Sequence, residues 1–132
     1  MIAVATLTVV SGDRRWRVTR PFFAHAGPGR VSDVTVGPDG LVHVLLRGDP
    51  LADPVAQPVV TLDPAGNEVA RWGSEVADGH MLAAHPDGRV FVVDRDRHRI
   101  LIFRDRQVIG QLGETDTPLA PFNHPCAVAF AP

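Results

Sequence analysis

Six histidines and a single cysteine are the residues of this 132-residue chain best suited to bind a metal ion or to act in catalysis. The histidines are His25, His43, His80, His85, His98 and His124. A catalytic zinc ion needs three protein ligands and one open position. The lone cysteine, Cys126, excludes an intramolecular disulfide and a cysteine-based zinc cage, and we expect it to be buried in an apolar strand. The sequence has no Gly-rich phosphate loop, no Gly-x-Ser-x-Gly motif and no recognisable Ser-His-Asp arrangement.

The elements that must position these residues repeat along the chain. Residues Val34–Val44 return as Leu82–Val92, and a third copy begins at Ala127–Pro132. Self-similarity at such a period marks stacked supersecondary units, each of which buries its faces against its neighbours. Here the unit is a small antiparallel sheet, so the sequence predicts β-propeller blades.

Short runs of Val and Ile lie between turn signals, and no segment has a sustained helical period, which predicts an all-β chain. The first repeat should contain strands Val31–Val36, Leu41–Leu46, Val59–Asp63 and Glu68–Trp72, and the second Met81–His85, Val90–Asp94, Arg99–Phe103 and Val108–Leu112. Strands Ile2–Val10 and Trp16–Arg20 should precede them, and Cys126–Phe130 should follow. The expected units are ring-closing strands (1–30), two blades (31–73 and 74–125) and the first strand of a further blade (126–132).

Turn chemistry supports tight hairpins within each repeat. Three segments share one pattern: Pro38-Asp39-Gly40, Pro64-Ala65-Gly66 and Pro86-Asp87-Gly88. Proline sets φ for the first corner of a type I turn, and glycine accepts the left-handed conformation that closes the hairpin. The insertion Gly48–Pro58 contains three prolines, so we expect a rigid, extended surface loop there.

Composition excludes several classes of function. Hydrophobic residues make up 45% of the chain, which is enough for a core, and the net charge is −2. All 13 cationic residues are arginine, but they alternate with aspartate and create no basic field for nucleic acid or an anionic membrane. The apolar start Ile2–Val10 is too short to span a bilayer and has no positive n-region, so we expect no signal peptide and a cytoplasmic location.

The second repeat carries a recognisable motif. Val92–Phe103 resembles the NHL-repeat signature V-x-D-x-x-x-x-R-I-x-x-F, and Gln111–Gly113 followed by Phe122–Pro125 resembles the link between NHL blades. Among NHL proteins, the chain resembles the N-terminal half of the catalytic domain of peptidylglycine amidoglycolate lyase (peptidyl-α-hydroxyglycine α-amidating lyase) and its bacterial relatives. That domain is a six-bladed propeller around a central metal site. The resemblance therefore implies about half of such a ring.

The resemblance also implies site residues. Leu46–Asp49 resembles an H-R-G-D stretch whose arginine binds substrate, which makes Arg47 a candidate anchor. Asp78–Leu82 resembles a P-H-G-L stretch whose histidine binds zinc, which makes His80 a candidate ligand. The family also binds a structural calcium ion through backbone carbonyls, and the matching positions here are Val34 and Leu82.

The chain departs from that pattern. Gly79 and Met81 replace the proline and glycine on either side of the zinc-binding histidine, and Cys126 lies in a stretch that differs from the family's P-T-D-V. The family's catalytic tyrosine and its two other zinc histidines would lie beyond Pro132, and this chain has no tyrosine. Arg47 has a structural alternative as well, because it could pair with Asp49 or Asp53.

Four other histidines have structural interpretations. His98 occupies a turn position of the NHL signature. His43 should face the side of its strand opposite to its two valine neighbours, as a hydrogen-bonded histidine between blades. His85, next to a turn, should form surface hydrogen bonds, and His124 precedes a proline in a loop.

We therefore expect a structural or binding module that self-associates into a closed propeller, most simply as a homodimer. Cys126–Phe130 of one copy would join Ile2–Val10 and Trp16–Arg20 of the other in each composite blade. The alternative is a metal-dependent, amidoglycolate-lyase-like enzyme with zinc and calcium, whose site is completed by another chain. A third possibility is a scaffold for a peptide or protein ligand. The isolated chain is not expected to be an enzyme or to bind nucleic acid or a membrane.

Overall fold

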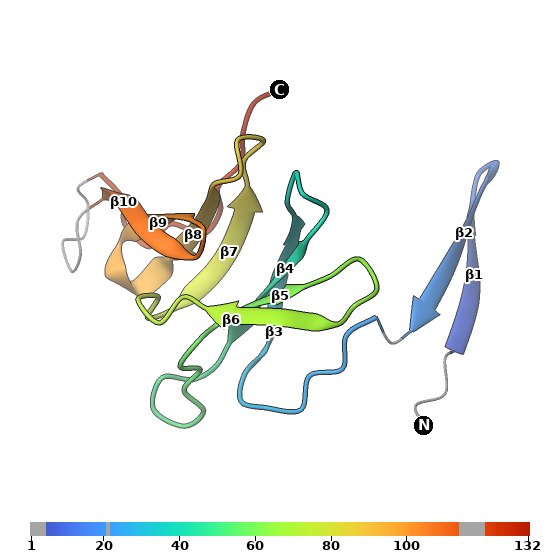
Figure 1. Cartoon of the computed structure of the whole chain (residues 1–132), viewed down its shortest axis with the longest axis horizontal. Helices are drawn as coiled ribbons and strands as arrows, with labels where there is room; N and C mark the ends of the chain where they lie inside the picture. The colour runs from blue at the N-terminus through green and yellow to red at the C-terminus, as the bar shows by residue number, and fades with distance from the viewer. Residues whose placement is uncertain (1–4, 21, 114–120) are drawn as a thin grey trace.

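A computed structural model describes residues 5–20, 22–113 and 121–132 and shows an all-β protein (Figure 1). The N-terminal hairpin consists of β1 (Ala5–Ser11) and β2 (Arg14–Arg20). The first sheet contains β3 (Arg30–Val36), β4 (Val42–Arg47), β5 (Val59–Leu62) and β6 (Glu68–Trp72). The second sheet contains β7 (Gly79–Ala84), β8 (Val90–Asp94), β9 (Arg99–Arg104) and β10 (Gln107–Gly113).

Each four-stranded sheet is an antiparallel meander in which sequential strands are neighbours, as expected of propeller blades of the NHL type. All the predicted strands within 31–113 are present, with ends that move by one or two residues. The one helical element in the described residues is a single 3₁₀ turn, η1 (Arg95–Arg97), between β8 and β9. None of the described structure includes a helix with the length and hydrophobicity of a membrane span.

The three predicted Pro-x-Gly turns are confirmed. Gly40, Gly66 and Gly88 adopt φ values of 81°, 90° and 90°, the left-handed region that favours glycine. The amide of each glycine donates to the carbonyl three residues earlier, at 3.0, 3.0 and 2.9 Å. These turns fix the register of the hairpins β3–β4, β5–β6 and β7–β8.

The largest core cluster lies between the two sheets. It combines one face of the first sheet with the facing side of the second, and its buried members are Leu45, Val59, Trp72, Val76, Leu82, Val90, Val92, Leu101 and Phe103. Each sheet also has an apolar outer face. Phe23 and Val55 pack on the outer face of the first sheet, whereas Phe122, Val128 and Phe130 pack on that of the second.

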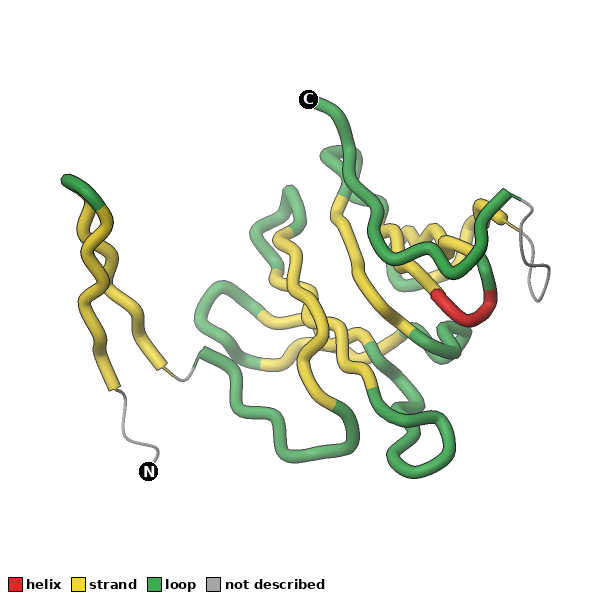
Figure 2. Tube along the Cα trace, turned by 180° about the vertical axis from the view of Figure 1, so that it is seen from behind, coloured by secondary structure: helices red, strands yellow, loops and turns green. Residues whose placement is uncertain are grey.

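The N-terminal hairpin stands apart from both sheets (Figure 2). Its strands pair with each other in antiparallel register, with Leu7 opposite Val18 and Val9 opposite Trp16. The predicted pair of N-terminal strands is therefore present from Ala5 onward, and residues 2–4 of the first predicted strand, Ile2–Val10, lie outside the described residues. The predicted role of these strands in closing a ring stays a prediction.

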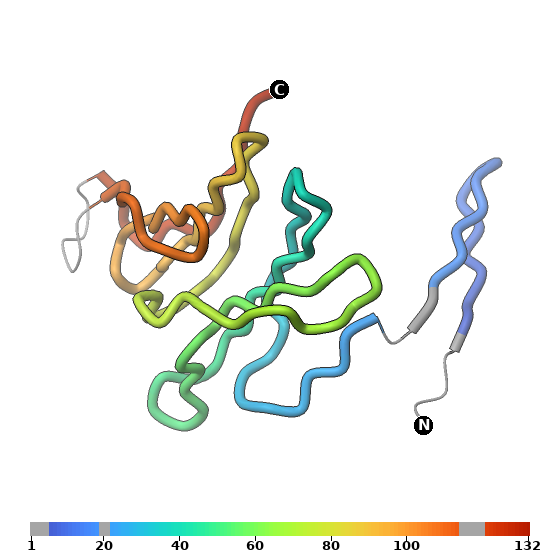
Figure 3. The backbone as a smooth tube through the Cα atoms, viewed as in Figure 1, coloured from blue at the N-terminus to red at the C-terminus, as the bar shows by residue number. Residues whose placement is uncertain are grey.

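Three local predictions were wrong. Cys126–Phe130 is not a strand, because it pairs with no strand in the part of the chain that the structure describes, and Cys126 is exposed rather than buried. The segment instead follows the outer face of the second sheet, as the tube in Figure 3 shows. The loop Gly48–Pro58 is not extended throughout, because the Asp49 carboxylate accepts the amides of Leu51 and Ala52 and closes a tight turn.

Candidate functional site

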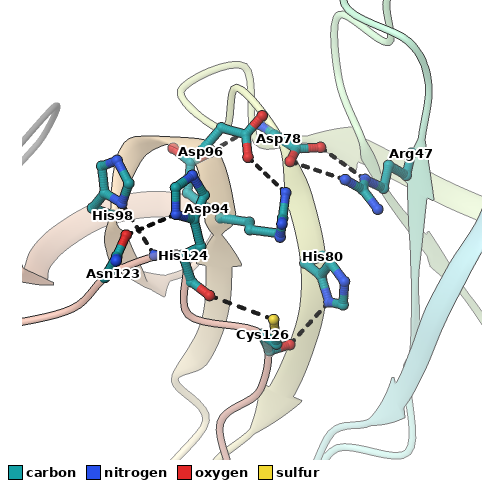
Figure 4. A network of polar contacts seen from close by, with 10 residues as sticks. Arg47, Asp78, His80, Asp94, Asp96, His98, Asn123, His124 and Cys126 are labelled. Atoms are coloured by element: carbon teal, nitrogen blue, oxygen red, sulfur yellow. Dashed lines mark hydrogen bonds and ion pairs between the residues drawn. The ribbon is translucent and has the colours of Figure 1, made fainter. Parts of the chain in front are cut away.

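An ion pair connects the end of β4 in the first sheet to the residue that precedes β7 of the second sheet (Figure 4). Arg47, the last residue of β4, donates from Nε to Oδ1 of Asp78 at 2.8 Å and from Nη2 to Oδ2 at 3.1 Å. The Asp78 side chain is only 5% exposed, and its hydrogen bond raises the pKa of Arg47. Arg47 thus forms an ion pair with an aspartate, as its structural alternative expected. The expected partner was wrong, because the guanidinium binds Asp78 and neither Asp49 nor Asp53.

The ion pair borders a polar cleft of about 530 Å³. The cleft is lined by Arg30, Arg47, Gly48, Asp49, Pro50, Asp53, Asp78 and Asp96. Four carboxylates and two guanidinium groups therefore face this space. Because Asp78 engages the Arg47 guanidinium through two hydrogen bonds, a substrate anion would have to compete with an internal carboxylate for this arginine.

Asp94 holds the segment that carries Asp78. Its fully buried carboxylate accepts the amides of Ala77 and Asp78 at 3.1 and 2.8 Å through Oδ1. Its other oxygen, Oδ2, accepts a hydrogen bond from Nε of Arg99 at 2.9 Å. Asp94 and Arg99 are the aspartate and arginine of the NHL signature, so their geometry gives that motif a structural role in fixing the loop before β7.

His80 takes part in a contact that recurs between successive repeats. Oγ of Ser32 donates to the carbonyl of His80 at 2.8 Å, and 48 residues separate the two. Nδ1 of His80 then donates to the carbonyl of Cys126 at 3.0 Å, and 46 residues separate them. Ser32, His80 and Cys126 hold the same position in three successive repeats. The side chain at this position in the first and second repeats therefore binds the backbone carbonyl at the same position of the following repeat.

The turn after the 3₁₀ element brings two other histidines together. His98 has a left-handed φ of 53°, and its Nδ1 accepts the backbone amide of His124 at 3.1 Å. Nδ1 of His124 donates to Oδ1 of Asn123 at 2.7 Å. These bonds attach the C-terminal segment to the second sheet, which agrees with the structural interpretation of His98.

The donor set does not form a complete zinc site. Within the part of the chain that the structure describes, no three His, Cys, Asp or Glu side chains are grouped closely enough to hold a metal ion. His80 therefore stands without the two further ligands that a catalytic zinc needs. Val34 and Leu82 occupy matching positions on the adjacent strands β3 and β7, and the calcium role of their carbonyls stays a prediction.

His43 lies between the sheets, as predicted. Its Nδ1 is 3.0 Å from Oγ1 of Thr61, which also accepts the indole N–H of Trp72 at 2.9 Å. Burial lowers the pKa of His43, and the nearby Asp39 carboxylate opposes part of that effect. A cavity of about 380 Å³ adjoins this group, and Phe103 contributes to its apolar wall.

The predicted surface role of His85 is also confirmed. Its Nδ1 accepts the backbone amide of Asp87 at 3.2 Å, and its ring meets Phe130 edge to face with centroids 4.7 Å apart. Phe130 in turn contacts Phe91 with ring centroids 4.8 Å apart. His85 therefore helps to seat the C-terminal segment on the second sheet.

Comparison with known families matches residues 80–103 to the NHL repeat. These residues are an NHL repeat. The match covers β8, η1 and all but one residue each of β7 and β9, and it includes the Asp94–Arg99 pair. No curated protein matches the chain. The first sheet has the same four-stranded meander as the sheet that contains the NHL repeat.

Sequence reasoning missed Asp78 as the partner of Arg47 and Asp94 as the centre of the network. The role of Asp94 could have been predicted from the NHL signature. That signature places an aspartate, Asp94, and an arginine, Arg99, five residues apart on either side of a turn. No comparable signal identifies Asp78, whose partner lies 31 residues away on another sheet.

Proposed function

We propose that this chain is a structural or binding module of NHL-type sheets that self-associates to complete a ring of blades. The observation that carries the proposal is the environment of one repeated position. Leu82 of β7 is buried against the first sheet, and Val128, in the same position of the next repeat, packs on the second sheet. Val34 holds that position in β3, yet it is 54% exposed. By this equivalence, Val34 should face a preceding sheet.

The exposed side of β3 extends beyond one residue. Val31 and Val36 are 57% and 62% exposed, so three valines of one strand lie in water. Burying apolar surface gives about 25 cal/mol per Å², and exposed sheet surfaces are usually covered by another chain or element. Closed cyclic symmetry is the usual way in which identical chains cover such surfaces.

Sedimentation velocity across a range of concentrations tests this proposal, and we expect a dimer at micromolar concentration. Val34→Ser should weaken the dimer, whereas Val69→Ser is the matched control, because Val69 is also 54% exposed but lies on β6, the outermost strand of its sheet. A wild-type protein that remains monomeric over the whole range would contradict self-association.

An amidoglycolate-lyase-like enzyme is the second candidate. One observation favours it: Nδ1 of His80 donates to a backbone carbonyl, and zinc-binding histidines commonly use one nitrogen in this way while the other binds the metal. The remaining ligands would have to come from another chain. Metal analysis of the purified assembly tests this candidate: stoichiometric zinc that is lost in His80→Ala supports it, and an assembly free of zinc contradicts it.

A further inference from the structure

The N-terminal hairpin is a two-stranded sheet with one apolar face. Leu7 and Val9 alternate along β1 and lie opposite Val18 and Trp16 of β2, so the four side chains share one face. Leu7, Val9 and Trp16 are 57%, 43% and 54% exposed. A two-stranded hairpin is marginally stable in water and usually needs a third strand or a packing partner. Among the described residues, the hairpin therefore has neither a third strand beside it nor a cover for its apolar face.

The C-terminal segment has a covered apolar side but unpaired backbone groups. Val128 and Phe130 cover the part of the outer face of the second sheet that lies near β7, but Cys126–Phe130 pairs with none of the described strands. The same face continues outward to β10, where Leu112 lies opposite Ile100 and is 45% exposed. Strands placed beside Cys126–Phe130 would pair with its backbone groups. The same strands would also cover the exposed part of the second sheet's outer face around Leu112.

One copy does not bring these two pieces together. Phe23, which follows the hairpin in the chain, packs on the outer face of the first sheet, while the segment packs on the outer face of the second sheet. The hairpin lies apart from both sheets, on the side of the first sheet, and away from the C-terminal segment (Figures 1 and 2). A second copy can supply the missing piece to each end, which gives a reciprocal contact with two-fold symmetry.

Charge favours the same pairing. The first 20 residues contain four arginines and one aspartate, a formal charge of +3, whereas the whole chain carries −2, which leaves −5 on the remainder. A cationic hairpin and an anionic body attract each other, and this steers their association.

We infer that the β1–β2 hairpin of one copy adds to Cys126–Phe130 of a second copy, with its Leu7–Trp16 face over Leu112, so that each contact builds a three-stranded sheet from two chains. This inference rests on the self-association proposed above and identifies the two surfaces that make it. The hairpin is thus an exchanged arm whose partner is a second copy of this chain.

Two variants of the full-length chain test the inference by sedimentation. Leu7→Ser should raise the dimer dissociation constant at least about tenfold, because it removes a side chain that the contact would bury. Leu51→Ser is the matched control, since Leu51 is 97% exposed at the tip of a loop away from both surfaces, and its dissociation constant should equal that of the wild type. Thermal unfolding of both variants verifies that the two sheets remain folded.

The single cysteine gives an independent readout. Cys126 is exposed in the free chain and lies in the receiving segment, so dimerisation should slow its reaction with a thiol reagent. A wild-type protein that is monomeric at every concentration would overturn both proposals. A dimer that Leu7→Ser leaves as tight as Leu51→Ser, or one in which Cys126 reacts as fast as in the monomer, would overturn this inference and leave self-association standing.

Discussion

The buried carboxylate of Asp94 gives the sharpest prediction about stability. Its side chain is 0% exposed, and it binds two backbone amides and the Arg99 guanidinium, which is itself 16% exposed. Asp94→Ala would leave the two amides without their acceptor and would take from the largely buried Arg99 its carboxylate, although Nη2 of Arg99 still donates to the carbonyl of Glu75 at 2.9 Å. Breaking a buried ion pair on one side costs about 3–5 kcal/mol. A domain of this size is stable by about 5–15 kcal/mol, so the variant should lose a large part of its free energy of unfolding.

Urea denaturation followed by tryptophan fluorescence measures this loss, because Trp72 is buried between the sheets and becomes exposed on unfolding, whereas Trp16 is already 54% exposed. Asp96→Ala is the control, because Asp96 pairs with Arg95 at the surface, where an ion pair contributes about 0–1 kcal/mol. Asp94→Asn keeps one acceptor oxygen for the amides and should fall between the two, which protects the test if Asp94→Ala does not fold. Equal stability of the Asp94→Ala and Asp96→Ala variants would refute the structural role given to the NHL signature.

Two further predictions concern pH and the hairpin turns. Burial lowers the pKa of His43 below 6.5, so at lower pH the unfolded chain binds a proton that the folded chain does not. The free energy of unfolding should therefore fall as pH drops below about 6.5, and this part of the pH dependence should vanish in His43→Gln; an unchanged pH profile would contradict it. Gly66→Ala should lower the melting temperature more than Gly40→Ala, because both glycines have left-handed φ, but only at Gly66 would an added Cβ meet the backbone oxygen of Phe22. Equal shifts in the two variants would show that this close approach carries no energetic weight.

The local features of this fold could be predicted because their causes are local. A proline, an acid or small residue and a glycine in sequence produce the same turn wherever they occur, as at Gly40 and Gly88. Runs of β-branched residues between such turns specify short antiparallel strands, so the meander of each sheet was predictable. The side of the strand on which His43 lies also followed from the two-residue period of a strand.

The sequence by itself determined the repeated sheets, their turns and the position of the NHL signature, because each depends on residues close together in the chain. Only the tertiary structure decided that Arg47 binds Asp78, that His80 binds the backbone at Cys126, and that Cys126–Phe130 pairs with no described strand. These features depend on how one sheet is placed against the next. Several carboxylates lie near Arg47 in sequence, and only the stacking of the sheets selects the distant one as its partner.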